Sequence, residues 1–220
     1  MNISKRKTII VISINFLFFI VISIILFTMN KKIDNTKTLF INFYNEQKKE
    51  TVNFTITEKD IIIGNSDAEV KFIIYAGYLC PHCKDFFLNT FPVIYKKYIL
   101  EGKVCAVIRF ITKPENKDAF YATKMAYCAQ DQETFLSYNK AIYENNDSFN
   151  IELINKIITQ NNIDSDCENE EDIIKNLQNN RKIAIEAGIR GTPSFIINGE
   201  LLKGNRRLRK INEIIEKNFN

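Results

Sequence analysis

Two cysteines spaced as Cys-x-x-Cys are the residues of this sequence best suited to chemistry. Cys80 and Cys83 enclose Pro81 and His82 in the stretch YAGYLCPHCKDFF, where a predicted strand gives way to a predicted helix. A cysteine in the first turn of a helix faces unpaired backbone N–H groups and the positive end of the helix dipole, which favour thiolate over thiol. We therefore expect Cys80 to be the nucleophile and Cys83 to be the more buried partner that closes a disulfide with it.

The two residues between the cysteines suit this arrangement. Pro81 falls at an early helical position, where a missing N–H does no harm, and His82 can add positive charge beside the thiolate. Each feature stabilises the reduced pair, which makes the corresponding disulfide more oxidising.

Metal and haem sites use similar cysteine spacings, but the rest of the sequence argues against both. A structural zinc site needs two further ligands, but His82 is the single histidine and no second Cys-x-x-Cys exists. Haem attachment needs a histidine directly after the second cysteine, where this chain has Lys84. A purely structural 80–83 disulfide would close too short a loop to add much stability. We expect no metal and no cofactor beyond the redox-active Cys80–Cys83 disulfide itself.

The second candidate motif is Gly191-Thr192-Pro193-Ser194, directly before a predicted strand. Taken alone, Thr-Pro before a strand is typical of a plain turn. A proline that leads an interior strand cannot donate to the ladder, and a cis bond there would hold the preceding carbonyl and N–H toward a partner chain. Together with Cys80 at the end of another strand, Thr192 and Pro193 are predicted to position a substrate beside the nucleophile.

The elements that carry these motifs alternate between strands and helices. Apolar runs of strand length lie at 61–63, 70–76, 103–111, 194–197 and 201–202. Residues 81–100 have helical periodicity between two of these runs, which predicts a βαβ unit with a kink at Pro92. Residues 115–188 are helical in pattern throughout, and an amphipathic helix closes the chain. The sequence therefore predicts an α/β fold with a helical insertion.

These motifs resemble the thioredoxin superfamily and, more narrowly, the DsbA-type thiol oxidases of the bacterial periplasm. The resemblance rests on the Cys80–Cys83 tetrapeptide, on the Thr192-Pro193 loop and on the helical insertion, and it covers roughly residues 61–219. It implies a thioredoxin fold and a thiol:disulfide oxidoreductase that introduces disulfides into exported proteins. The family commonly has an acidic residue six positions before the first active-site cysteine, and this chain has Ile74 there.

The resemblance also implies partners and leaves rival functions open. The partners would be reduced or unfolded exported proteins and a membrane oxidase that regenerates the disulfide, with no nucleic acid. One rival is a disulfide isomerase or reductase on the same fold. Another is an exported binding or surface protein that has lost turnover. Some alphaproteobacterial members of the family have a cysteine pair that resembles Cys128 and Cys167, which implies a structural disulfide, whereas the residues alone leave open whether these two pair.

The remaining sequence bears on location and domain organisation. The chain has 220 residues and a net charge of +4, of which Lys5, Arg6 and Lys7 precede an uncharged apolar run at 9–27. That run would be about 28 Å long as a helix, close to the thickness of a bilayer, so residues 1–30 are predicted to be an uncleaved anchor or a cleaved signal. The basic residues before it predict export of the body.

Residues 31–60 are predicted to be a polar spacer and residues 61–220 the thioredoxin-like domain. The expected location is a bacterial periplasm, either tethered to the inner membrane or released. From Met29 onward the chain is nearly neutral, with 27 Lys and Arg against 26 Asp and Glu, which argues against a nucleic-acid binder.

Overall fold

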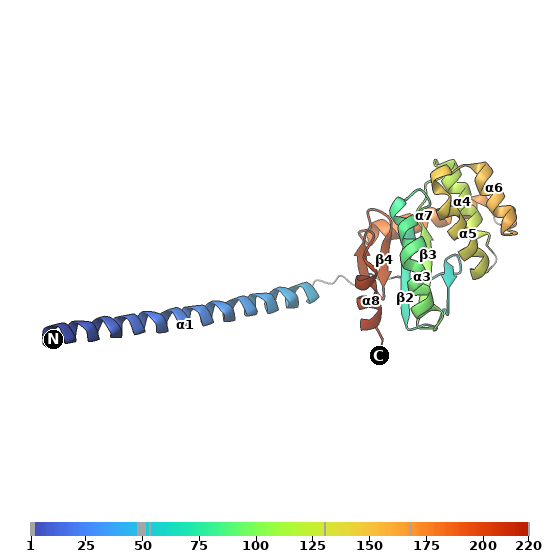
Figure 1. Cartoon of the computed structure of the whole chain (residues 1–220). Coiled ribbons are helices and arrows are strands. Elements are labelled where there is room, and N and C mark those ends of the chain that lie inside the picture. Colours follow the sequence, from blue (N-terminus) through green and yellow to red (C-terminus); the bar gives the residue numbers. More distant parts are fainter. Residues whose placement is uncertain (1–2, 48–51, 53, 130, 168, 220) are drawn as a thin grey trace. The chain divides into compact units, whose positions relative to one another are not determined.

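Figure 1 shows the computed structural model of the chain. It describes all residues except 1–2, 48–51, 53, 130, 168 and 220, and for residues 3–18, 42–47 and 148 it describes the backbone alone. The chain divides into two units, residues 1–49 and residues 50–220. The second unit, called the body below, contains all five cysteines.

A five-stranded sheet in the order β1-β3-β2-β4-β5 forms the centre of the body. Its strands are β1 (Ile61–Ile63), β2 (Val70–Ala76), β3 (Val104–Phe110), β4 (Ser194–Ile197) and β5 (Glu200–Lys203). Strands β2 and β3 are parallel, and the other neighbouring pairs are antiparallel. Because β2 and β3 are interior strands covered on both faces, their sequences are mostly apolar, with Lys71 and Arg109 as the charged exceptions.

Successive side chains of β2 point to opposite faces of the sheet. Phe72 and Ile74 join the larger of two buried clusters, which also takes in the insertion helices. Ile73 and Tyr75 join the smaller cluster on the other face, which also contains Ala184 of helix α7 (Glu170–Glu186). All four β2 side chains are fully buried, and each large apolar one contributes on the order of 1.5–3 kcal/mol. This packing fixes the end of β2, from which the Cys-x-x-Cys segment follows.

The helix after β2 changes geometry along its length. It consists of α2 (Pro81–Asp85), η1 (Phe86–Thr90), α3 (Phe91–Ile94) and η2 (Tyr95–Ile99), and both η segments are π-helical. Pro92, expected to kink this helix, lies in the first turn of α3, directly after the first π segment. A π segment before proline accommodates the ring and the missing N–H.

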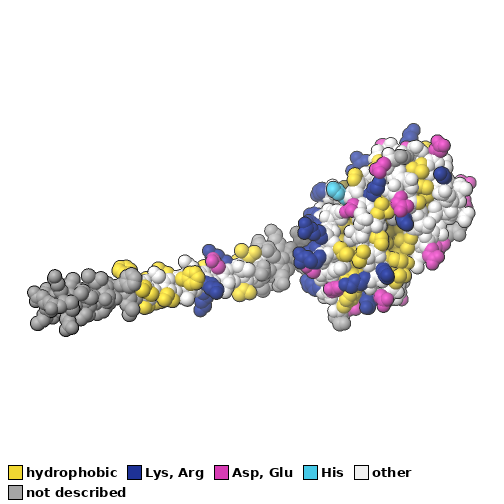
Figure 2. Space-filling view, viewed as in Figure 1, with side chains coloured by type: hydrophobic (Ala, Val, Ile, Leu, Met, Phe, Trp, Pro, Cys, Tyr) yellow, Lys and Arg dark blue, Asp and Glu magenta, His cyan; other side chains and the backbone are white. Residues whose placement is uncertain are grey.

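The insertion and the closing helix complete the body. The insertion holds α4 (Lys117–Tyr127), α5 (Gln132–Glu144), the short η3 (Asn146–Ser148), α6 (Ile151–Gln160) and α7 (Glu170–Glu186), and α8 (Leu208–Lys217) ends the chain. Asp131, Asn150 and Asn169 begin α5, α6 and α7 by accepting backbone N–H groups of the first turn. The predicted α/β fold with a helical insertion is confirmed. On the face drawn in Figure 2, basic and acidic side chains are interspersed over the body, as its nearly neutral charge leads one to expect.

Helix α1 (Ile3–Gln47) makes up the first unit. The predicted anchor or signal at 9–27 lies within this helix, but residues 9–18 fall outside the described side chains. In the part of the chain whose side chains are described, the structure has no helix with both the length and the apolar character needed to cross a bilayer. The anchor stays a prediction. Residues 31–47, within the predicted polar spacer, continue helix α1.

The body also begins before the predicted boundary at residue 61. Val52, Phe54 and Ile56 pack against the smaller buried cluster. Asp60, just before β1, forms an ion pair with Arg109 of β3 at 2.7 Å, and both side chains are 2% exposed. The polar composition of this segment concealed its role, because a buried acid paired with a distant arginine has no local signature in a sequence.

Candidate active site

Cys80 lies where the turn after β2 enters helix α2. Its Sγ caps the helix by accepting a hydrogen bond from the backbone N–H of Cys83 at 3.3 Å. Pro81 is the first residue of α2, where no N–H partner is needed. Cys80 is partly exposed, whereas Cys83 is fully buried. Of this pair, only Cys80 is open to another molecule.

The two sulfur atoms differ in acidity. A hydrogen bond from the Cys83 side chain is the main cause that lowers the pKa of Cys80 from the ordinary 9.0 to about 5, against the opposing effect of burial. The Thr192 side chain and the backbone N–H groups of Cys83 and His82 lower this pKa further. Burial raises the pKa of Cys83, and so does the neighbouring Cys80. At neutral pH, Cys80 is therefore a thiolate and Cys83 a thiol.

The Thr192-Pro193 loop lies directly against Cys80. The peptide bond between these two residues is cis, and Pro193 leads into β4, which pairs with β2. The Sγ of Cys80 is 3.2 Å from the Thr192 carbonyl oxygen, to which the thiol form donates. Ser194 braces the loop by donating its hydroxyl to the Gly191 carbonyl at 2.7 Å. The fold thus joins two motifs that are far apart in sequence into one site.

The side chains of His82 and Pro81 contribute less directly to the Cys80 thiolate than the sequence suggested. Both side chains are exposed. The contribution of His82 to the low pKa of Cys80 comes through its backbone N–H. The Cys83 thiol, the Thr192 side chain and the backbone N–H groups at the helix start are therefore the groups that stabilise the thiolate.

The buried sulfur of Cys83 has an aromatic surrounding that the sequence analysis missed. Ile74, at the position where the family commonly has an acid, is fully buried in the same cluster as Cys83. Tyr143 of α5 stacks on Phe87 at 5.0 Å. Burial first, and then Cys83 and Cys80, raise the pKa of Tyr143, so its hydroxyl lies within electrostatic reach of both sulfur atoms. Tyr143 comes from the insertion, and no local pattern marks it.

A groove of about 710 Å³ opens beside the nucleophile. Cys80 and Thr192 line it, together with Ala119 of α4 and residues of α7. The groove has the size of a small-molecule or peptide site, and the partly exposed Cys80 is among the residues that line it.

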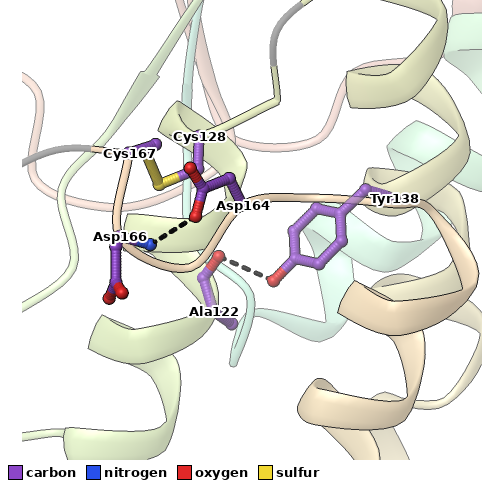
Figure 3. Close-up of a disulfide and its surroundings, with 6 residues drawn as sticks. All are labelled: Ala122, Cys128, Tyr138, Asp164, Asp166 and Cys167. Atoms are coloured by element: carbon purple, nitrogen blue, oxygen red, sulfur yellow. Dashed lines mark hydrogen bonds between the residues drawn. A yellow bond between two sulfur atoms is a disulfide. The ribbon is translucent and has the colours of Figure 1, made fainter.

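The other three cysteines lie away from this groove. Cys128 and Cys167 form a disulfide, the pairing that the family resemblance implies, and it ties the end of α4 to the loop before α7 (Figure 3). Beside it, Asp164 accepts the backbone N–H of Asp166 and so shapes the loop that carries Cys167. Cys105 is a fully buried free thiol on β3. The described side chains include no cluster of His, Cys, Asp and Glu that fits a metal ion.

Comparison with known families and sequences finds thioredoxin-like and disulfide oxidoreductase relatives. The family model described as thioredoxin matches residues 56–217. A Rickettsia prowazekii protein named protein-disulfide oxidoreductase is 30% identical over 186 residues, covering 77% of this chain and 67% of the relative. Its counterpart in Rickettsia typhi is 29% identical, covering 76% of this chain and 66% of the relative. The chain thus spans about two thirds of the length of these relatives.

Solved structures agree with this result. The crystal structure of alpha-DsbA1 from Wolbachia pipientis has a TM-score of 0.67 and 27% identity, covering 74% of this chain and 92% of that one. BdbD from Bacillus subtilis, at 19% identity and a TM-score of 0.60 over 78% of this chain and 98% of that one, shares the fold.

Proposed function

We propose that this chain, which belongs to the thioredoxin superfamily and within it to the DsbA-type disulfide oxidoreductases, acts as an oxidase that introduces disulfide bonds into exported proteins. The observation that carries the proposal is the stabilised thiolate of Cys80 beside Thr192, with Cys83 buried behind it. Stabilising the thiolate favours the reduced pair, and a disulfide whose reduced form is stabilised is a strong oxidant.

The reaction begins from the oxidised Cys80–Cys83 pair. A substrate thiolate attacks Sγ of Cys80, the bond between the two cysteines breaks, and Cys83 leaves as a thiolate that takes up a proton. A second substrate thiolate then attacks the substrate sulfur of the mixed disulfide and releases Cys80 as a thiolate. The substrate gains a disulfide, and the enzyme keeps the two electrons. Thr192 and Pro193 hold the substrate backbone beside Cys80 during the exchange.

Turnover requires an electron acceptor outside this chain. We assign that part to a membrane-bound oxidase that takes electrons from the reduced cysteine pair. The proposed location is the bacterial periplasm, with the apolar stretch at 9–27 serving as a tether or as a cleaved signal.

The test is the reduction potential of the Cys80–Cys83 pair in the full chain, equilibrated in glutathione buffers and read by alkylation and mass shift. If the chain is an oxidase, the reduction potential of this pair should lie well above that of the glutathione pool, toward about −120 mV. A potential near about −270 mV would assign the chain to the reductases instead. Since Cys128–Cys167 also reacts when reduced, a Cys80→Ser/Cys83→Ser variant supplies the baseline.

A second measurement separates the oxidase from a binding protein without turnover. The full chain, oxidised beforehand, is mixed with a reduced two-cysteine peptide, and peptide oxidation is compared between the wild type and the Cys80→Ser variant. If the chain is an oxidase, the variant should no longer transfer a disulfide to the peptide. Equal peptide oxidation by both proteins would contradict the proposed role of Cys80.

A further inference from the structure

The groove beside Cys80 has an unusual distribution of charge. Three basic residues, Lys113, Arg181 and Arg190, are among those that line it, and no acidic residue is. The body as a whole is close to neutral, so this concentration is not a consequence of the overall composition.

Two of these cations have no polar partner among the side chains and backbone groups that the structure describes. Lys113 and Arg181 are exposed, and neither side chain has a hydrogen bond or ion pair with any described residue. Arg190 donates to the carbonyl oxygens of Ile185 and Ile189, at 3.1 and 3.2 Å, which holds its guanidinium over the end of α7. The acidic residues nearest along the chain, Glu115, Asp118 and Glu186, do not line the groove.

Several apolar side chains also line the groove. Leu79, directly before the nucleophile, is 53% exposed, and Ile185 of α7 is 49% exposed. Ile111 and Ala184 line the groove as well. Exposed large apolar side chains that flank a reactive sulfur fit the alternating side chains of an extended peptide.

We infer that the groove binds an extended substrate segment with acidic side chains next to the cysteine that Cys80 attacks. This rests on the proposed function, and it names the substrate class that the site prefers. Lys113 and Arg181 attract the acidic side chains, and Leu79 and Ile185 contact apolar ones. Unpaired cations beside a reaction site increase the rate at which oppositely charged partners associate, and salt screens that effect.

The experiment compares three reduced two-cysteine peptides that differ only in whether Glu, Ser or Lys flanks each cysteine. Each peptide contains one tryptophan as a fluorescent reporter, because the chain itself has none. The oxidised full chain is mixed with each peptide, and the second-order rate constant of peptide oxidation is measured in 0.05 M and 0.5 M salt. The Glu peptide should react about tenfold faster than the Lys peptide at low salt, and the ratio should approach one at high salt.

Charge reversal identifies the residues responsible. In Lys113→Glu/Arg181→Glu the preference should invert, so that the Lys peptide reacts faster. The matched control, Lys96→Glu/Lys156→Glu, makes the same change in net charge at two exposed positions outside the groove and should keep the wild-type preference. If the control inverts the preference as well, overall charge is responsible and the groove assignment is wrong.

The Ser peptide separates this inference from the proposed function. If wild type oxidises the Ser peptide but treats the Glu and Lys peptides alike at low salt, the acidic preference is refuted and the oxidase stands. If the Ser, Glu and Lys peptides all remain reduced, the proposed function fails, and the inference fails with it.

Discussion

At the scale of single residues, the two active-site cysteines differ because their surroundings differ. Cys80 receives hydrogen bonds from the Cys83 thiol, from the Thr192 side chain and from the start of a helix, whereas Cys83 is enclosed by aromatic and aliphatic side chains. The first sulfur is stabilised as an anion, and the second is stabilised as a neutral thiol. One spacing of three residues therefore produces a nucleophile and a protonated partner.

The low pKa of Cys80 predicts how its reactivity depends on pH. The thiolate fraction of reduced Cys80 rises as pH rises through about 5, so alkylation by iodoacetamide should be nearly maximal at neutral pH. The contribution of Cys80 to the stability of the folded reduced chain also increases with pH. The lowered pKa stabilises the folded reduced chain fully above the ordinary pKa of 9.0, and that contribution decreases as pH falls toward about 5.

The measurement is the rate of alkylation of the reduced full chain between pH 3 and pH 9, with Cys80→Ser as the control that removes the fast phase. An inflection near pH 9 would show that the helix start and Thr192 do not stabilise the thiolate.

Tyr143 is predicted to assist the departure of Cys83. In the structure its hydroxyl donates to the Gly77 carbonyl at 3.5 Å and lies within electrostatic reach of the buried sulfur, at a site where Ile74 offers no acid. In Tyr143→Phe, attack on the Cys80–Cys83 disulfide should slow by about 3- to 10-fold, because the leaving thiolate loses a hydrogen-bonding group worth on the order of 1 kcal/mol. The measurement is the single-turnover rate with a reduced peptide.

Tyr138→Phe is the matched control for Tyr143. It removes a hydroxyl from the same helix, but that hydroxyl donates to the Ala122 carbonyl at 2.8 Å, close to the Cys128–Cys167 disulfide (Figure 3). The pKa of Cys80, read from alkylation, should stay near 5 in both variants. Equal slowing in the two variants would indicate a packing effect and would remove Tyr143 from the mechanism.

At the scale of elements, the site depends on segments that meet from distant parts of the chain. The end of β2 and the start of α2 supply the cysteines, and the loop before β4 supplies Thr192. Helix α5 adds Tyr143 and helix α7 adds Arg181, so the insertion contributes both to the buried side of the site and to its open side. The segment before β1 holds the sheet from the opposite face through Asp60 and Arg109.

The Asp60–Arg109 pair is predicted to be a major contribution to the stability of the body. Asp60→Asn leaves the buried guanidinium without its counter-charge, which should reduce the free energy of unfolding by about 3–5 kcal/mol. Urea unfolding of the full chain, followed by circular dichroism, measures the change.

Asp147→Asn serves as the comparison for this prediction. It removes the partner of Lys84 at 2.8 Å, where the Asp147 side chain is 86% exposed, and should change the free energy of unfolding by no more than about 1 kcal/mol. Similar losses in the two variants would contradict the special role of the buried pair.

At the scale of the whole molecule, the sequence predicted the parts that have local signatures. Strands β1, β2 and β4 have the predicted bounds, and the insertion lies where helical periodicity placed it. The meeting of Cys80 with Thr192 followed from the positions of two motifs at strand ends. Asp60, Tyr143 and the cations of the groove were missed, because their roles arise only when residues far apart in sequence are packed together.

The placement of the five cysteines sets the valency of the folded molecule. Cys128 and Cys167 form a disulfide with each other, Cys105 is fully buried on β3, and Cys83 is fully buried behind Cys80. Cys80 has the one free thiol of the body that is open to another macromolecule, and the exposed Cys167 is held in its disulfide with Cys128. While that disulfide is intact, the folded chain is therefore monovalent through its free thiols and captures one substrate chain at a time.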